Sequence, residues 1–176
     1  LLGDLCLVPT NMETRPAGSP SFGTFANGLA SIGIEEGVIL ATGDSEIALG
    51  PNTSSNDGTT GGGTAGFDAD LAAISGSSAL FNVTILEFDF IPDEDKIAFD
   101  YVFASEEYCE YVSTIFNDAF GFFLSGPGIN GPYTDNAINI ATIPGTNTPV
   151  AINNVNWTLN SSYYVTNAVN EFPGTP

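Results

Sequence analysis

The chain has 176 residues, and a hydrophobic content of 43% is enough to build the core of one domain. It carries 21 acidic residues against two basic ones, Arg15 and Lys96, for a formal net charge of −19. Because binding to phosphate requires many Lys and Arg side chains, this balance excludes a nucleic-acid partner and disfavours an anionic membrane surface, and no apolar run reaches the length of a bilayer span.

The first part of the chain is expected to be poor in regular structure. Residues 1–36 are interrupted by several Pro and Gly residues, which break helices and strands. A short apolar run at 38–41 predicts a strand that ends at the polar residues 42–44. Residues 51–66 are Gly and small polar side chains, which predicts a long loop of functional or mobile character.

The middle of the chain predicts one short helix and then a β-hairpin. Asp68 can cap a helix over 69–74, since its carboxylate can accept hydrogen bonds from the free amides of the first turn. Large apolar residues alternate with acids over 86–90, and the acidic turn 92–95 leads into a second alternating run over 97–103. Two alternating runs joined by a short polar turn predict a hairpin.

The stretch from 99 to 128 predicts two core strands around an acidic loop. Large side chains alternate over 99–103, the pattern breaks at Ser105-Glu106-Glu107-Tyr108, and a second alternating run follows over 120–124. This loop holds most of the chemistry that the sequence offers.

Further short strands are expected at 137–143, 150–155 and 163–165, each bounded by Pro, Gly or Asn. Many short strands with almost no helical periodicity indicate an all-β fold, an antiparallel β-sandwich or jelly roll with one or two short helices and long loops. We expect a single domain over residues 1–176.

The acidic loop predicts a metal site. Histidine is absent, so only oxygen ligands are available, and these favour a hard cation, Ca²⁺ before Mg²⁺. The candidate ligands are Glu106, Glu107, Asn117, Asp118, Asp100 and Asp44. The alternative is structural: Ser105 caps a helical turn that favours acids at its start, and Asp118 satisfies backbone amides.

Two further groups of residues have a predicted role. Cys6 and Cys109 would close a loop of about 100 residues, worth roughly 4 to 5 kcal/mol in the chain-entropy model, if they form a disulfide in an oxidising compartment; two buried free thiols are the alternative. Tyr108, Tyr111 and Trp157 lie near polar loops and are candidates for stacking on sugar rings, and core packing is the alternative.

The same residues argue against an enzyme. Without histidine, Ser-His and Cys-His machinery is excluded. A glycosidase needs two carboxylates facing one another across a cleft, which Glu106 with Glu107 or Asp118 could in principle supply, but adjacent residues are expected to point in different directions.

Three blocks of sequence carry a resemblance to a known family. SEEY at 105–108, FNDAFGFFLSGPG at 116–128 and PGTNTPVAINNVN at 144–156 resemble the choice-of-anchor L domain family. The resemblance implies a β-rich bacterial module, common in Bacteroidetes, that is secreted or displayed on the cell surface. Some members have a cysteine near the start and another after SEEY, which implies a Cys6–Cys109 bridge. Family members continue past YYVTN at 163–167 into further strands, so we expect either a fragment of the domain or closing strands supplied by another chain.

The sequence therefore predicts a non-enzymatic, extracellular structural or adhesive module of a large bacterial surface protein or filament, stabilised by calcium. The expected partners are other chains of the same assembly, as in a homo-oligomer, or neighbouring domains. The alternative is a carbohydrate-binding, lectin-like domain that uses the acidic and aromatic loops and binds glycans. No direct insertion into a membrane is expected.

Overall fold

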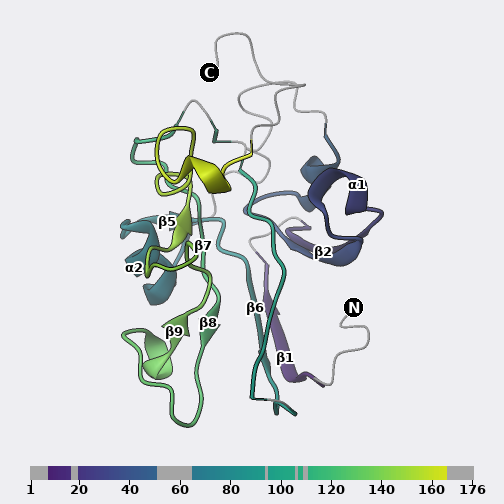
Figure 1. The fold of residues 1–176 in the computed structure, drawn as a ribbon, viewed down its shortest axis with the longest axis vertical. Coiled ribbons are helices and arrows are strands. Elements are labelled where there is room, and N and C mark those ends of the chain that lie inside the picture. The colour runs from purple at the N-terminus through teal and green to yellow at the C-terminus, as the bar shows by residue number, and fades with distance from the viewer. Residues whose placement is uncertain are drawn as a thin grey trace. The chain divides into compact units, whose positions relative to one another are not determined.

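The computed structural model describes residues 8–16, 20–50, 65–93, 95–105, 107–108 and 111–165. The chain divides into two compact units. Unit 1 consists of Leu1–Gly50, Gly58–Gly66 and Phe81–Val102, and unit 2 consists of Pro51–Asp57, Phe67–Leu80 and Phe103–Pro176. Short strands in small antiparallel sheets and two short α-helices confirm the all-β class (Figure 1). The sandwich arrangement and the single domain stay predictions.

In unit 1, β1 (Thr10–Arg15) pairs antiparallel with β6 (Ile85–Asp89), and the two strands lie side by side in Figure 1. The register runs from Arg15 opposite Ile85 to Thr10 opposite Asp89, with an irregularity between Thr10 and Glu13. The prediction of irregular structure for residues 1–36 is therefore wrong. All six residues of β1 are exposed, so this strand has no alternating apolar pattern that would reveal it.

A second antiparallel pair in unit 1 joins β2 (Phe22–Ala26) to β3 (Glu36–Leu40) across the short helix α1 (Leu29–Ile32). The backbone amide of Gly28 donates to the carbonyl oxygen of Glu35 at 3.0 Å and closes the connection. A Cβ atom at Gly28 would lie 2.4 Å from the carbonyl oxygen of Ile34, so the connection requires glycine. The strand predicted at 38–41 is confirmed over residues 38–40, which belong to β3, whereas Ala41 lies after its end.

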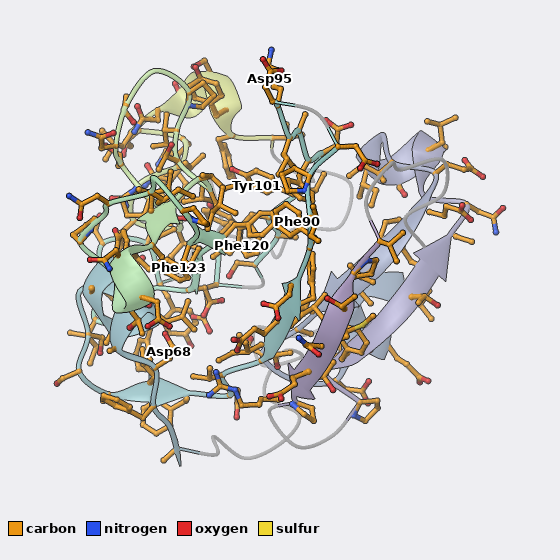
Figure 2. The ribbon with its side chains drawn as sticks, turned by 90° about the horizontal axis from the view of Figure 1, so that it is seen from below. Asp68, Phe90, Asp95, Tyr101, Phe120 and Phe123 are labelled. Atoms are coloured by element: carbon orange, nitrogen blue, oxygen red, sulfur yellow. The ribbon has the colours of Figure 1, made fainter. Side chains whose placement is uncertain are left out.

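The predicted hairpin between 86–90 and 97–103 is wrong in its pairing. β6 is confirmed as a strand, but its partner is β1, and none of the described residues 95–105 belongs to a strand. Alternation of apolar residues indicates which face of a strand is buried, but it does not identify the strand with which it pairs. Asp93 and Asp95 of the predicted acidic turn are exposed, and Figure 2 shows Asp95 pointing outward.

In unit 2, the helix α2 (Ala69–Ser75) lies beside β7 (Ala119–Phe120) (Figure 1). The predicted Asp68 cap is confirmed: its Oδ1 accepts from the amides of Asp70 at 3.1 Å and Leu71 at 2.9 Å. Gly121, directly after β7, permits close packing against α2, because a Cβ atom at this position would lie 2.9 Å from Cδ1 of Ile74 and 2.5 Å from the ring of Phe123.

Two pairs of very short strands complete unit 2. β7 pairs with β10 (Val150–Ala151), and β8 (Phe123–Leu124) pairs with β9 (Ile138–Asn139). The strands predicted at 120–124, 137–143 and 150–155 are therefore present only in part. The strand predicted at 163–165 is wrong, because Ser161–Tyr163 form the 3-10 helix η4 and the next two residues are not in a strand.

The remaining elements are short. They are η1 (Ser45–Leu49), β4 (Ala65–Gly66), β5 (Leu80–Phe81) and η3 (Thr134–Asn136). Within the described residues, the buried hydrophobic side chains all belong to unit 2. They are Ile74, Ala137, Ala141, Ile143, Val150, Ala151, Ile152 and Val155. All of them except Ile74 lie within residues 137–155, directly before the loop that carries Trp157.

Candidate functional site

The predicted metal ligands are distributed over both units. Asp44 and Asp100 belong to unit 1, and Glu107, Asn117 and Asp118 belong to unit 2. Glu106, Cys6 and Cys109 lie outside the described residues, so the predicted disulfide does as well. Across the part of the chain that the structure describes, no three His, Cys, Asp or Glu side chains are grouped to hold a metal ion. The calcium site stays a prediction.

Asp44 has a local structural role. It stands directly before η1, and its Oδ1 accepts a hydrogen bond from the amide of Glu46 at 2.9 Å. This is the geometry of an N-cap, in which a side-chain oxygen satisfies a free amide of the first turn. Asp100 is exposed.

Ser105 and Asp118 join the two ends of the acidic loop. The Ser105 hydroxyl donates to Oδ2 of Asp118 at 2.6 Å and accepts from the amide of Glu107 at 3.0 Å. The amide of Tyr111 donates to the carbonyl oxygen of Glu107 at 3.1 Å. These contacts match the structural alternative, in which Ser105 caps a turn.

Asn117 uses both ends of its side-chain amide to hold unit 2 together. Its Nδ2 donates to the carbonyl oxygen of Ser75, the last residue of α2, at 2.8 Å. Its Oδ1 accepts from the backbone amide of Asn153 at 3.1 Å. Asn153 continues the network: its Nδ2 donates to the carbonyl oxygen of Thr114 at 3.2 Å, and its Oδ1 accepts from the amide of Ser113.

The network leads into a loop that is fixed by asparagine side chains. Asn156 is only 2% exposed, and its Oδ1 accepts from the amides of Thr158 at 3.0 Å and Leu159 at 2.9 Å. Its Nδ2 donates to the carbonyl oxygen of Ile152 at 3.0 Å. Asn160 donates to the carbonyl oxygen of Asn154 at 2.7 Å. We call residues 156–164 the aromatic loop; it is the yellow segment that includes η4 in Figure 1.

Three aromatic rings support the aromatic loop. The ring of Tyr164 packs edge-on against Tyr108, with centroids 5.1 Å apart, and edge-on against Trp157, with centroids 6.4 Å apart. The hydroxyl of Tyr108 donates to the carbonyl oxygen of Val155 at 2.5 Å. Two of the predicted stacking residues, Tyr108 and Trp157, therefore share Tyr164 as a neighbour. The sequence prediction missed Tyr164, and the adjacent aromatic pair YY at 163–164 was the available signal.

Tyr108 is held in its neutral form. Burial, followed by the nearby Tyr164 and the Asp118 carboxylate, raises the pKa of the Tyr108 hydroxyl from 10.0 to about 12. A neutral hydroxyl is the form that can donate to Val155. Tyr108 therefore acts as a structural support of the loop.

Tyr111 lies in a different aromatic pair. Its ring packs edge-on against Phe116, with centroids 5.4 Å apart and an interplanar angle of 79°. Phe116 is 55% exposed. The stacking role predicted for Tyr111 stays a prediction.

The aromatic loop presents large side chains to solvent. Trp157, Leu159 and Tyr163 are 37%, 49% and 51% exposed. Because the backbone beneath them is fixed by Asn156, Asn160 and the Tyr108–Tyr164 pair, these side chains stand on an ordered base.

The comparisons place the chain in a family. One family model, described as the choice-of-anchor L domain, matches residues 1–173, and searches of curated proteins and of solved structures found no match. The family indicates a secreted or surface-associated protein. Within the described ranges, no helix combines the length and the apolar character that crossing a bilayer requires. The chain belongs to the choice-of-anchor L domain family.

Proposed function

We propose that this chain is a non-enzymatic adhesive module of a large bacterial surface protein, and that it contacts its target through the aromatic loop. One observation carries the proposal: Trp157, Leu159 and Tyr163 are exposed on a loop whose backbone is fixed by buried side-chain hydrogen bonds. Trp and Tyr are the residue types that contribute most to binding at protein surfaces.

The order of the loop supports a binding role. A flexible loop loses conformational freedom when it binds, and that loss reduces the affinity. In this loop the side chain of Asn156 makes hydrogen bonds to Ile152, Thr158 and Leu159, so much of the ordering is complete before a partner arrives. Apolar side chains kept in water by an ordered backbone are available for contact.

The chemistry of the loop and of the neighbouring Tyr108 supports a non-enzymatic role. The chain has no histidine, which removes the usual base for a Ser or Cys nucleophile. Tyr108, with its pKa raised to about 12, is a poor general base near neutral pH and already donates to Val155.

Calcium is a second part of the proposal. The support is chemical: Glu107, Asn117 and Asp118 supply oxygen atoms, the ligands that Ca²⁺ prefers. A carboxylate has about four lone-pair directions, and the hydrogen bond from Ser105 uses one of those on Asp118. We also propose a disulfide between Cys6 and Cys109 and assembly with other copies of the chain.

The adhesive proposal is tested with beads that display the whole chain. Detachment under flow is measured on surfaces coated with neutral polysaccharide, with an extracellular matrix protein, or with the chain itself. We expect wild-type beads to resist detachment on at least one surface and beads with the double variant Trp157→Ala/Tyr163→Ala to lose that resistance. Beads with Phe116→Ala are the control, because Phe116 is exposed and lies outside the aromatic loop. Equal detachment of wild-type and double-variant beads on every surface contradicts the proposal.

A further inference from the structure

The charge of the chain is distributed very unevenly. All 21 acidic residues and both basic residues lie outside residues 136–170: Asp135 precedes this stretch and Glu171 follows it. The neutral stretch contains the aromatic loop. In a protein with a net charge of −19, the exposed side chains of the aromatic loop itself, among them Trp157, Leu159 and Tyr163, are therefore uncharged.

The charge distribution narrows the class of ligand. Anionic polymers are repelled by the protein as a whole, and a cationic peptide is attracted to the acidic parts of the chain. A second copy of the chain carries the same net charge, so electrostatic attraction does not favour it at this loop. A neutral molecule is neither attracted nor repelled by the net charge of the protein, so local contacts decide where it binds.

The chemistry of the loop selects among neutral molecules. A sugar ring has an apolar face of C–H groups and a rim of hydroxyl groups, so it matches an exposed aromatic ring beside hydrogen-bonding groups. Trp157 supplies the largest ring, and Tyr163 supplies a second ring with a hydroxyl group. Tyr164 packs against Trp157 and is itself packed against Tyr108, whose hydroxyl is bound to Val155.

We propose that the aromatic loop binds a neutral polysaccharide, with Trp157 stacking on a sugar ring and Tyr163 adding contact and a hydrogen bond. This inference rests on the adhesive function proposed above and names the target of the same site. Tyr108 and Tyr164 are positioning residues, because they act through Trp157.

The chain contains a built-in probe for this site, because Trp157 is its single tryptophan. The whole chain is titrated with cellohexaose, maltohexaose and mannohexaose, and with polygalacturonate as an anionic comparison, and the emission of Trp157 is recorded. We expect a saturable change in emission with at least one neutral oligosaccharide and none with polygalacturonate. We expect Tyr163→Ala to weaken the binding by about tenfold, which corresponds to 1.4 kcal/mol, and the control Phe116→Ala to leave it unchanged.

Three outcomes overturn the inference: no change in emission with any neutral oligosaccharide at millimolar concentration, an equal response to polygalacturonate, or an equal loss of binding in Phe116→Ala. A failed titration is distinguished from a failed adhesive function by the bead measurement. If beads adhere to the matrix protein or to the chain itself through Trp157 and Tyr163 while no sugar binds, the adhesive function stands and the saccharide target is wrong. Calorimetry with Trp157→Phe separates stacking from folding, since the smaller ring keeps an aromatic side chain at the position and is expected to weaken binding without changing the melting temperature.

Discussion

Asn156 and Leu159 are joined by two hydrogen bonds in opposite directions. The amide of Leu159 donates to Oδ1 of Asn156, and the amide of Asn156 donates to the carbonyl oxygen of Leu159, each at 2.9 Å. Trp157 and Thr158 lie between them, so this pair fixes the tip from which Trp157 reaches solvent. The side chain of Asn156 is therefore the main local determinant of the loop.

We predict that Asn156→Ala lowers the free energy of unfolding by about 1 to 3 kcal/mol, because the buried residue Ile152 loses the hydrogen bond from the Asn156 side chain. Urea unfolding followed by circular dichroism measures the change. The matched control is Asn147→Ala, an exposed asparagine of the same unit, for which we expect a change within about 0.5 kcal/mol. Equal stability of the two variants contradicts the role given to Asn156.

A second prediction concerns the hydrogen bond that joins the end of α2 to the side chain of Asn117. In Asn117→Asp the new carboxylate cannot donate to the carbonyl oxygen of Ser75, and it faces that oxygen with a negative charge. The carboxylate still accepts from the amide of Asn153, so the lost bond is the one to Ser75. We expect a loss of about 1 to 3 kcal/mol in the free energy of unfolding, measured by urea unfolding. Ser75→Ala is the control, since Asn117 binds the backbone of that residue and the bond is retained. Equal stability of Asn117→Asp and the wild type is the contrary result.

A third prediction follows from the raised pKa of Tyr108. Because the folded-state pKa of about 12 is above the unfolded value of 10.0, the stability that depends on neutral Tyr108 is complete below pH 10 and is lost as the pH rises from 10 to about 12. Ultraviolet titration of the tyrosines should show a late step near pH 12 that is missing in Tyr108→Phe. A wild-type titration that is complete well below pH 12 contradicts this assignment.

A fourth prediction tests the proposed calcium site. Because an ion bound only to the native state raises stability with its concentration, EDTA should lower the melting temperature, and added Ca²⁺ should restore it more effectively than Mg²⁺. Asp118→Asn should reduce the calcium dependence, and Asp93→Asn, in the exposed turn, should leave it unchanged. If EDTA does not change the melting temperature, the calcium proposal is wrong.

The features that could be predicted from the sequence are those determined by neighbouring residues. The α2 cap by Asp68 depends on amides two and three residues away, and β3 is a compact apolar run, so both were predicted correctly. β1 could not be found, because its six exposed residues bury no face and leave no period of two. The partner of β6 could not be found either, since alternation does not specify pairing.

The candidate site was predictable only in part. Tyr108 and Trp157 were selected for their residue type near polar loops. Their common neighbour Tyr164 packs against Tyr108, which lies 56 residues earlier in the chain. Asn117 was predicted as a metal ligand because it offers a side-chain oxygen in an acidic loop. Its hydrogen bonds join it instead to Ser75 and Asn153, which are 42 and 36 residues away. Contacts at such separation depend on the packing of unit 2, and one sequence does not show them.

The most direct test of the adhesive function is the detachment of beads that display the wild-type chain or its Trp157→Ala/Tyr163→Ala variant, compared at equal surface density. We predict that the wild-type beads remain attached at shear that removes the variant beads, while both chains have the same circular dichroism spectrum. Indistinguishable detachment of the two sets of beads, with both chains folded, would contradict the assignment of the contact surface to the aromatic loop.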